Sequence, residues 1–485
     1  MKISTLAWLG VIGLGALGGA AVADEKIPIT TSSAEARQLY LKGRDLSERL
    51  RATDARAFFQ QAAAKDPDFA LAQVGLANTA GTAKEFFDAV GRAVALAGKA
   101  SDGEQQIVCA LDAGAKAEPA RQKECLTKLT QAYPNDARAH NLMGAYYFAR
   151  QEWAASVGEF QKATALSAEF SQPYNQMGYA HRFMGKYPEA EQAFKKYIAL
   201  LPDDPNPYDS YAELLMKMGR FEDSIKNYEK ALSVDRNFVA SYIGIGNDRV
   251  FMGQPDEARQ AYARLMAIAR TPGEKRQALL WTAMSYVHEG ATDKAIAELQ
   301  KMADIDQAGN DLAALSAVYN QMGNVLLEAG RIGEAAAKYE QQIATIDKAN
   351  VPAQVKEGAH RQALFDAARV ALAKSDRAGA KAKAAEYAAA VEAGNRPFEV
   401  RQSHELAGRI GLADKNYKLA VAELRQANDQ DPRVLYLTAL ALQGAGDAQQ
   451  AKEVGAQAAD FNGLSATYGY VRGKARAMIT APKRD

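Results

Sequence analysis

The chain has 485 residues, with 59 lysine and arginine residues against 58 aspartate and glutamate residues, and 48% of it is hydrophobic. This balanced composition excludes a disordered or collagen-like chain, and two cysteines in this length exclude a small disulfide-rich scaffold. The near-neutral charge also argues against a nucleic-acid partner, because phosphate contacts need a net positive surface.

The first 23 residues have the pattern of a secretory signal peptide. Lys2 is their only charge, and the small residues Ala21, Val22 and Ala23 directly precede Asp24. We therefore expect export to the periplasm, with cleavage after Ala23. An uncleaved membrane anchor is the alternative, because the apolar run is about long enough to span a bilayer. Contact with a membrane is expected only in that case.

A repeat of 34 residues begins near residue 137. Small residues recur at its eighth position, at residues 144, 178, 212 and 246, and aromatic residues recur at its twenty-fourth, at residues 160, 194, 228 and 262. Within one unit, the apolar residues of 208–215 and of 221–232 each have helical spacing, with Gly219 between the two stretches. We expect each unit to form an antiparallel pair of helices, in which the small residues allow close approach and the aromatic ring fills space against the next hairpin. Stacked hairpins would bury each other's apolar faces.

The length of the unit, its small positions and its closing proline resemble the tetratricopeptide repeat. The closing prolines are Pro67, Pro134, Pro202 and Pro432. The resemblance implies an all-α fold, a right-handed superhelical solenoid of about ten antiparallel helix hairpins. It covers nearly all of the chain after residue 23, strongly at 137–270 and weakly at 70–136 and 349–400.

The strength of the repeat divides the chain into seven segments. They are a signal peptide (1–23), N-terminal hairpins that are partly divergent (24–136), regular units (137–270), further units (271–348), an Ala-rich divergent hairpin (349–400), C-terminal units (401–462) and a C-terminal capping helix (463–485). The capping helix is expected to present a polar outer side through Arg472, Lys474, Arg476, Lys483 and Arg484. A basic patch for an anionic surface is the alternative.

Cys109 and Cys125 are the only cysteines, and a turn expected near residues 114–119 places them at the same height on one hairpin. In an exported protein two facing cysteines usually pair, so we expect a disulfide. Two buried reduced thiols are the alternative.

The sequence contains no recognisable catalytic or metal-binding pattern. Its five histidines are dispersed among different units, outside any His-Glu-x-x-His pattern or cysteine–histidine cluster. A phosphate-binding Gly-x-x-x-x-Gly-Lys-Ser/Thr loop and a Gly-x-Ser-x-Gly elbow are also missing. We therefore expect no enzymatic activity, no metal and no cofactor.

In the tetratricopeptide family, positions 2, 5, 9, 12 and 13 of each unit line a concave groove. The resemblance implies that these positions bind a partner here, at Asn141, Asn175, Tyr179, Arg182, Asp209, Asn247, Asn320 and Asn324. An asparagine amide can donate to and accept from the backbone of an extended peptide. A solvated polar face without a ligand is the alternative. The lysine and asparagine pair that the family uses for chaperone C-termini does not occur in any unit.

These features predict a non-catalytic scaffold or adaptor in the cell envelope that binds a protein or an extended peptide in its groove. An accessory factor for envelope polysaccharide or cell-wall assembly is the alternative, which aromatic platforms in the groove would favour. Export and the neutral charge argue against an RNA-binding helical repeat.

Overall fold

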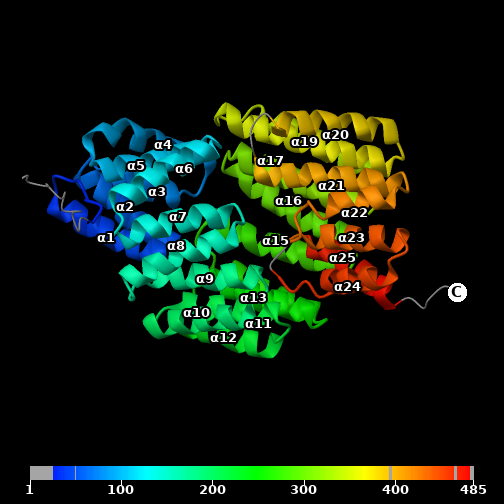
Figure 1. Cartoon of the computed structure of the whole chain (residues 1–485), viewed down its shortest axis with the longest axis horizontal. Coiled ribbons are helices and arrows are strands. Elements are labelled where there is room, and N and C mark those ends of the chain that lie inside the picture. The colour runs from blue at the N-terminus through cyan, green and yellow to red at the C-terminus, as the bar shows by residue number, and fades with distance from the viewer. Residues whose placement is uncertain (1–25, 50, 393–395, 464–466, 481–485) are drawn as a thin grey trace, which may run out of the picture.

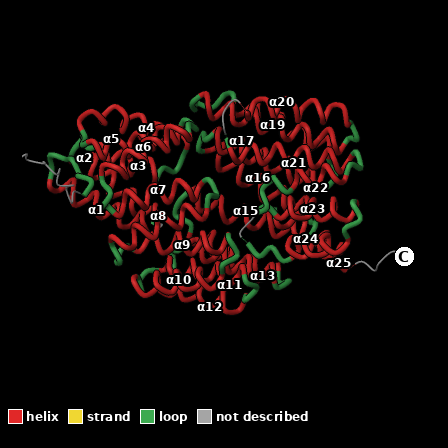
Figure 2. Tube along the Cα trace, viewed as in Figure 1, coloured by secondary structure: helices red, strands yellow, loops and turns green. Residues whose placement is uncertain are grey.

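The computed structural model describes residues 26–49, 51–392, 396–463 and 467–480. The predicted signal peptide lies outside these residues. In the described ranges the regular elements are twenty-five α-helices and one short 3-10 helix, Ala97–Lys99, as Figure 2 shows. The first twenty-four α-helices pair in chain order into twelve hairpins. This confirms the all-α solenoid, with somewhat more hairpins than expected.

The first seven hairpins run from residue 34 to residue 268. Their helices are α1 (Ala34–Glu48), α2 (Ala52–Lys65), α3 (Ala70–Asn78), α4 (Ala83–Leu96), α5 (Asp102–Ala115), α6 (Pro119–Ala132), α7 (Ala137–Ala149), α8 (Trp153–Leu166), α9 (Ser171–Phe183), α10 (Tyr187–Leu200), α11 (Pro205–Lys217), α12 (Phe221–Val234), α13 (Val239–Phe251) and α14 (Pro255–Ile268).

Five further hairpins and a single last helix follow. They are α15 (Pro272–His288), α16 (Thr292–Ala308), α17 (Leu312–Glu328), α18 (Ile332–Ile346), α19 (Ala353–Ala373), α20 (Arg377–Glu392), α21 (Pro397–Ala413), α22 (Tyr417–Leu424), α23 (Pro432–Gly444), α24 (Ala448–Ala459) and α25 (Tyr468–Thr480).

The repeated small and aromatic positions hold the two helices of a hairpin together. The ring of Phe160 in α8 covers Gly144 in α7 so closely that a Cβ on the glycine would lie 2.6 Å from the ring. The hydroxyl of Ser156, at the twentieth position, donates to the carbonyl of Gly144 over 2.9 Å. The aromatic residue of the repeat therefore fills space within its own hairpin, and not only against the next one as we expected.

The turn between the two helices of a hairpin often places a glycine at positive φ, although Gln151, Ser375 and Lys415 hold this conformation in other hairpins. Gly185, Gly219 and Gly253 lie 34 residues apart and have φ values of 72°, 75° and 78°. This left-handed conformation ends the first helix without the steric cost that a side chain would bring.

The hairpins wind into a coil with the odd-numbered helices inside. Odd-numbered helices of successive hairpins contact each other along most of the array, for example α9 with α11 and α11 with α13. Figure 1 shows α1–α13 on one side of the molecule and α16–α25 on the other, with α15 between them.

Contacts between distant hairpins tie the coil together. Arg51, in the turn after α1, pairs with Asp235 before α13 at 3.3 Å, and Arg270 before α15 pairs with Asp54 at 3.2 Å. Arg401 in α21 donates to the side chain of Gln151, in the turn between α7 and α8. These contacts join hairpins that lie far apart in the sequence.

The last helix closes the stack and also enters the coil. α25 packs on α24, as expected for a cap, but it also contacts α15 and α23. Arg472 does not face outward as we expected, because it is 2% exposed and its guanidinium lies 5.1 Å from the centre of the Phe251 ring in α13. Lys474 and Arg476 do lie on the exposed side of the helix.

The two cysteines lie on neighbouring helices of one hairpin. Cys109 in α5 and Cys125 in α6 are joined by a disulfide, with their Cα atoms 6.0 Å apart. The hairpin is one of those whose repeat landmarks are weakest in the sequence.

Candidate functional site: the inner groove

A short segment without regular secondary structure lies across the start of the coil. Its backbone N–H groups donate to three carboxylates that stand near the N-terminal ends of successive inner helices. The pairs are Ile27 N with Asp136 Oδ2 at 2.8 Å, Thr30 N with Glu104 Oε1 at 2.8 Å, and Ser32 N with Asp66 Oδ2 at 2.8 Å. The segment thus passes α7, α5 and α3 in turn, with two or three residues for each hairpin.

The same carboxylates also organise the helix starts. Asp136 is the N-cap of α7 and accepts from the backbone N–H of Arg138, and Glu104 belongs to the capping box of α5. Because helix N-termini carry partial positive charge, these acidic side chains are stabilised where they stand. The hydrogen bonds from Thr31 and Ser32 hold the pKa of Asp66 below its usual value.

A cavity of about 670 Å³ opens beside this segment. Ile27, Pro28 and Ile29 form one wall, and residues of α1, α3, α5 and α7, with Phe59 of α2 and Gln172 of α9, form most of the rest. The apolar part of the helical wall consists of Tyr40, Leu41, Phe59, Leu71, Val74, Ile107 and Leu142, and the polar part includes Arg37, Arg44, Ser47, Glu48, Asn78, Arg138, Asn141 and Gln172. A concave space of this size with a few converging polar groups is typical of a ligand site.

Asn141 is the predicted site residue that lines this cavity. Its Nδ2 donates to Gln172 Oε1 over 2.8 Å, whereas its buried Oδ1 has no hydrogen-bond partner in the described part of the chain. A buried carbonyl oxygen without a partner is costly, and a donor from a ligand would satisfy it.

Charged residues at the cavity are only partly paired. Glu48 accepts from Arg138 at 3.4 Å and lies 3.8 Å from Arg44. Burial raises the pKa of Glu48, against the opposing effect of the two arginines. Arg37 is exposed at the mouth, and no ion pair of its side chain is seen among the described residues.

The prediction missed several residues of this cavity, although the groove positions of the repeat identify them when they are applied to the first unit. A unit starting at residue 36 places its positions 2, 5, 9, 12 and 13 at Arg37, Tyr40, Arg44, Ser47 and Glu48, and all five line the cavity. These positions were not predicted because the first unit matches the repeat pattern only weakly.

Four other predicted residues lie on α9 and α11, and three of them bond between neighbouring hairpins. Tyr179 donates to Ser210 at 3.2 Å, and Arg182 pairs with Glu213 at 3.0 Å. Asp209 accepts from Ser241 at 2.7 Å. Asn175 is 2% exposed, and its buried Oδ1 has no hydrogen-bond partner among the described residues. The other three side chains connect successive inner helices, and the role of all four in binding a partner stays a prediction.

Asn247 on α13 is also engaged inside the protein. Its Nδ2 donates to the carbonyl of Ile243 at 3.0 Å, and it is buried. Next to it in sequence, Asp248 is fully buried, and this burial raises the pKa of its carboxyl to about 8.

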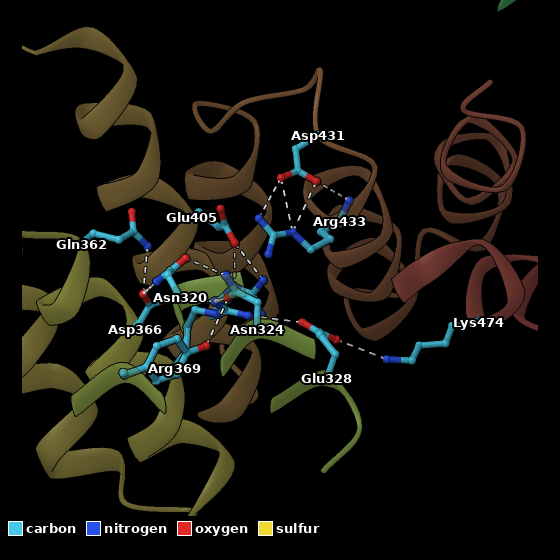
Figure 3. A network of polar contacts seen from close by, with 12 residues as sticks. Asn320, Asn324, Glu328, Gln362, Asp366, Arg369, Glu405, Asp431, Arg433 and Lys474 are labelled. Carbon is cyan, nitrogen blue, oxygen red and sulfur yellow. Dashed lines mark hydrogen bonds and ion pairs between the residues drawn. The ribbon is translucent and has the colours of Figure 1, made fainter. Parts of the chain in front are cut away.

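Asn320 and Asn324 belong to a polar network on the inner side of the second half of the coil, shown in Figure 3. Asn320 donates to Asp366 at 2.7 Å, and Arg369 donates to Asn324 at 2.5 Å and to Asp366 at 3.0 Å. Glu328 links this group to α25 through Lys474 at 3.4 Å.

The network pairs its charges internally. It combines the acidic residues Glu328, Asp366, Glu405 and Asp431 with the basic residues Arg369, Arg409, Arg433 and Lys474. Burial raises the pKa of Asp366 although Arg369 opposes the effect. Because the network contains four acidic and four basic residues, it carries no excess charge. The side chains of Asn320 and Asn324 are engaged in hydrogen bonds within the network. Their role in binding also stays a prediction.

The described residues contain neither a cluster suited to a metal ion nor a helix suited to span a membrane. No group of three or more histidine, cysteine, aspartate or glutamate side chains there is arranged to hold a metal ion. Among the described helices, none combines the length and apolar character needed to cross a bilayer.

Known proteins match parts of this chain. The tetratricopeptide repeat family matches residues 171–204, 206–238 and 243–310. Hsp70-Hsp90 organizing protein 2 of Arabidopsis thaliana is 30% identical over 79 residues, which cover 16% of this chain and 14% of that protein. Protein O-mannosyl-transferase TMTC3 of Homo sapiens is 23% identical over 169 residues, which cover 32% of this chain and 18% of that protein. The chain thus matches less than a fifth of the length of these relatives.

A solved structure of a tetratricopeptide repeat protein from Parabacteroides merdae is similar over 54% of this chain and 99% of that one, with a TM-score of 0.37 and 14% identity. The family matches extend from α9 to α16. The chain thus contains tetratricopeptide repeats between residues 171 and 310, within its stack of helix hairpins.

Proposed function

We propose that this protein is a non-catalytic scaffold of the cell envelope, which binds an extended segment of a partner protein in the N-terminal part of its inner groove. The observation that carries the proposal is the segment at Ile27–Ser32, whose backbone is held by carboxylates of three successive hairpins.

The geometry of that segment suits an extended chain in general. Packed helices lie about 8–10 Å apart, and an extended chain advances about 3.3 Å per residue, so three residues span one hairpin. A partner segment beside Ile27–Ile29 would meet the same inner helices with the same period. The cavity at this place offers it Leu142 and Tyr40 for apolar side chains and Asn141 for its backbone.

The chemistry of the cavity favours a peptide over a glycan. Its polar wall consists of arginine, lysine, glutamate, aspartate, asparagine, glutamine and serine side chains, and only Tyr40 and Phe59 among its lining residues are aromatic. Sugar rings bind best on exposed aromatic faces, and Phe59 is buried against Gly43 and Gly75. A role in polysaccharide assembly therefore has weaker support.

Photocrosslinking from inside the cavity tests the proposal. A photoreactive amino acid at Ala145, which is exposed and lines the cavity, should capture one protein partner from the native envelope. The same amino acid at Lys195, exposed on the outer helix α10, is the matched control.

A second substitution tests whether the captured partner is bound specifically in the groove. Asn141→Ala in the Ala145 probe should weaken the capture, because it removes the amide that faces the partner backbone. Equal capture at Ala145 and Lys195, or capture that Asn141→Ala does not change, would reject the groove as the binding site. Capture of glycan instead of protein would favour the polysaccharide role.

Export is a separate part of the proposal, supported by the sequence of residues 1–23. The mass of the protein purified from the periplasmic fraction of its native host should correspond to a chain that begins at Asp24. A full-length mass in the membrane fraction would instead indicate an uncleaved anchor.

A further inference from the structure

A second cavity, of about 290 Å³, lies where the turn after α1 meets the inner helices of the middle hairpins. Its walls come from residues 51–54, from α9 and α11, from residues 235–240 and from the start of α15. None of its lining residues lines the N-terminal cavity described above. A water molecule occupies about 30 Å³ in the liquid, so this space holds a ligand of about ten non-hydrogen atoms.

Acidic side chains outnumber basic ones around this cavity. Its lining residues include five carboxylates but only two arginines, Arg51 and Arg270. The carboxylates belong to Asp54, Asp209, Glu213, Asp235 and Glu274. Arg51 pairs with Asp54 at 2.9 Å and with Asp235 at 3.3 Å. Arg270 pairs with Asp54 at 3.2 Å and with Glu274 at 3.3 Å. Glu213 pairs with Arg182, so Asp209 is the carboxylate of this group that has no basic partner among the described residues.

Asp209 is a buried acid with one oxygen left free. The residue is 3% exposed and lines the cavity. Its Oδ1 accepts from the hydroxyl of Ser241 at 2.7 Å, whereas its Oδ2 accepts no hydrogen bond in the described part of the chain. Burial, together with the nearby carboxylate of Glu213, raises the pKa of Asp209 well above its usual range. A buried carboxylate without a counter-charge is costly, and a cation in the cavity would supply that charge.

The composition of the walls favours an organic cation over a metal ion. Calcium and magnesium take six or more oxygen ligands, and the described residues hold no group of three or more acidic, histidine or cysteine side chains arranged for a metal. An ammonium group donates three hydrogen bonds, and the side-chain amides of Asn237 and Gln277 line the same cavity as Asp209. Residues 238–240, which are Phe, Val and Ala, add an apolar wall suited to an alkyl chain.

We propose that this cavity binds a primary ammonium group on a short alkyl chain, with Asp209 as its ion-pair partner. A free aliphatic amine carries this group, and so does a lysine side chain of a partner protein. The site lies on other helices than the N-terminal cavity, so it does not depend on the function proposed for that cavity.

Calorimetric titration of the purified protein with n-butylamine tests the proposal. This amine is the side chain of lysine without its backbone, and n-butanol is the uncharged control of the same length. The wild type should bind n-butylamine and not n-butanol. Asp209→Asn keeps the shape of the side chain and an acceptor for Ser241 but removes the charge, so it should weaken the binding at least about tenfold. The matched control Asp203→Asn, at an exposed aspartate, should bind as the wild type does.

A second variant tests the location without a change of charge. Ala240 is half-buried and lines the cavity, so Ala240→Met should fill the space and weaken the binding as well. Circular dichroism verifies that each variant is folded. The proposal would be overturned by the absence of n-butylamine binding to the wild type, by equal binding of n-butanol, or by unchanged affinity in Asp209→Asn or Ala240→Met. An equal loss in Asp203→Asn would show only a general attraction to acidic groups and would also overturn it.

A further probe distinguishes the two sources of the ammonium group. Nα-acetyl-lysine N-methylamide carries the same alkyl ammonium on a peptide backbone. Binding at least as tight as that of n-butylamine would assign the cavity to a lysine of a partner protein, whereas binding of n-butylamine alone would assign it to free amines. A failed photocrosslink at Ala145 would leave each of these outcomes unaffected.

Discussion

The ring of Phe194 covers Gly178 so closely that a Cβ on the glycine would lie 2.5 Å from the ring atom Cε1. Phe194 is fully buried, and it belongs to the outer helix of the same hairpin. The contact joins the two helices at their closest approach and repeats in the hairpins of Gly144, Gly246 and Gly323.

We expect Gly178→Ala to destabilise the protein by about 1–3 kcal/mol, because the buried ring has no room to move away from the added methyl group. Gly158→Ala is the matched control, since Gly158 lies inside α8 and a Cβ there meets no atom within 4 Å. The control should gain about 1 kcal/mol through helix propensity. Urea denaturation followed by circular dichroism measures both shifts, and two shifts in the same direction would contradict the packing argument.

Reduction of the disulfide should destabilise the hairpin of α5 and α6. Cys109 and Cys125 are 16 residues apart, and a crosslink of this span stabilises by about 3 kcal/mol through the unfolded chain. Thermal unfolding with and without a reductant should show the loss as a lower midpoint. The double variant Cys109→Ser/Cys125→Ser should have the lower midpoint in both conditions, and a wild-type midpoint that ignores the reductant would contradict the prediction.

Asp248 should make the protein less stable as the pH rises. Burial raises the pKa of Asp248 to about 8 in the folded protein, whereas an unfolded aspartate has a pKa of about 3.9. Between these values the folded state holds a proton that the unfolded state has lost, so this contribution is fully present below about pH 4 and is lost as the pH approaches 8.

The variant Asp248→Asn cannot ionise and should lose this dependence. Relative to the wild type, its free energy of unfolding should rise by about 2 kcal/mol between pH 5 and pH 9, less than the full pKa shift implies because the site can relax. Denaturation at the two pH values measures the difference. Parallel pH profiles of the two proteins would show that Asp248 is ionised in the folded state.

Asn320→Ala and Asn141→Ala should differ in their effects on stability. Asn320 donates to Gln342 and to the buried Asp366, so its loss leaves a buried carboxylate short of a donor and costs about 2 kcal/mol. Asn141→Ala removes one hydrogen bond but also an unsatisfied buried oxygen, and the net change should be under about 1 kcal/mol. Thermal unfolding of the two variants tests this order, which an equal loss of stability would contradict.

The contacts inside a hairpin could be predicted from sequence because they repeat. The spacing of Gly144 and Phe160 is found again in later units, and a local pattern of this kind depends only on the helical period and on a short turn. The expected pairing of Cys109 and Cys125 had the same basis, since the turn between their helices sets their relative height.

Contacts between distant hairpins could not be predicted in this way. Tyr468 meets Phe251 only because the coil returns α25 to α13, and small rotations between many hairpins decide where that return occurs. Likewise, the sequence of its own unit offers Asn320 no evident hydrogen-bond partner, but its amide donates to Asp366 of the divergent hairpin.

The contacts between distant hairpins constrain how many hairpins the coil can contain. In an open array one repeat can be deleted and the others keep their neighbours. Here the loss of a single hairpin between α2 and α13 would shift Asp235 away from Arg51, and a loss between α8 and α21 would shift Arg401 away from Gln151. Deletion or duplication of one unit would therefore disturb residues that are far from the altered unit in sequence, so the length of this array is constrained as that of a closed ring would be.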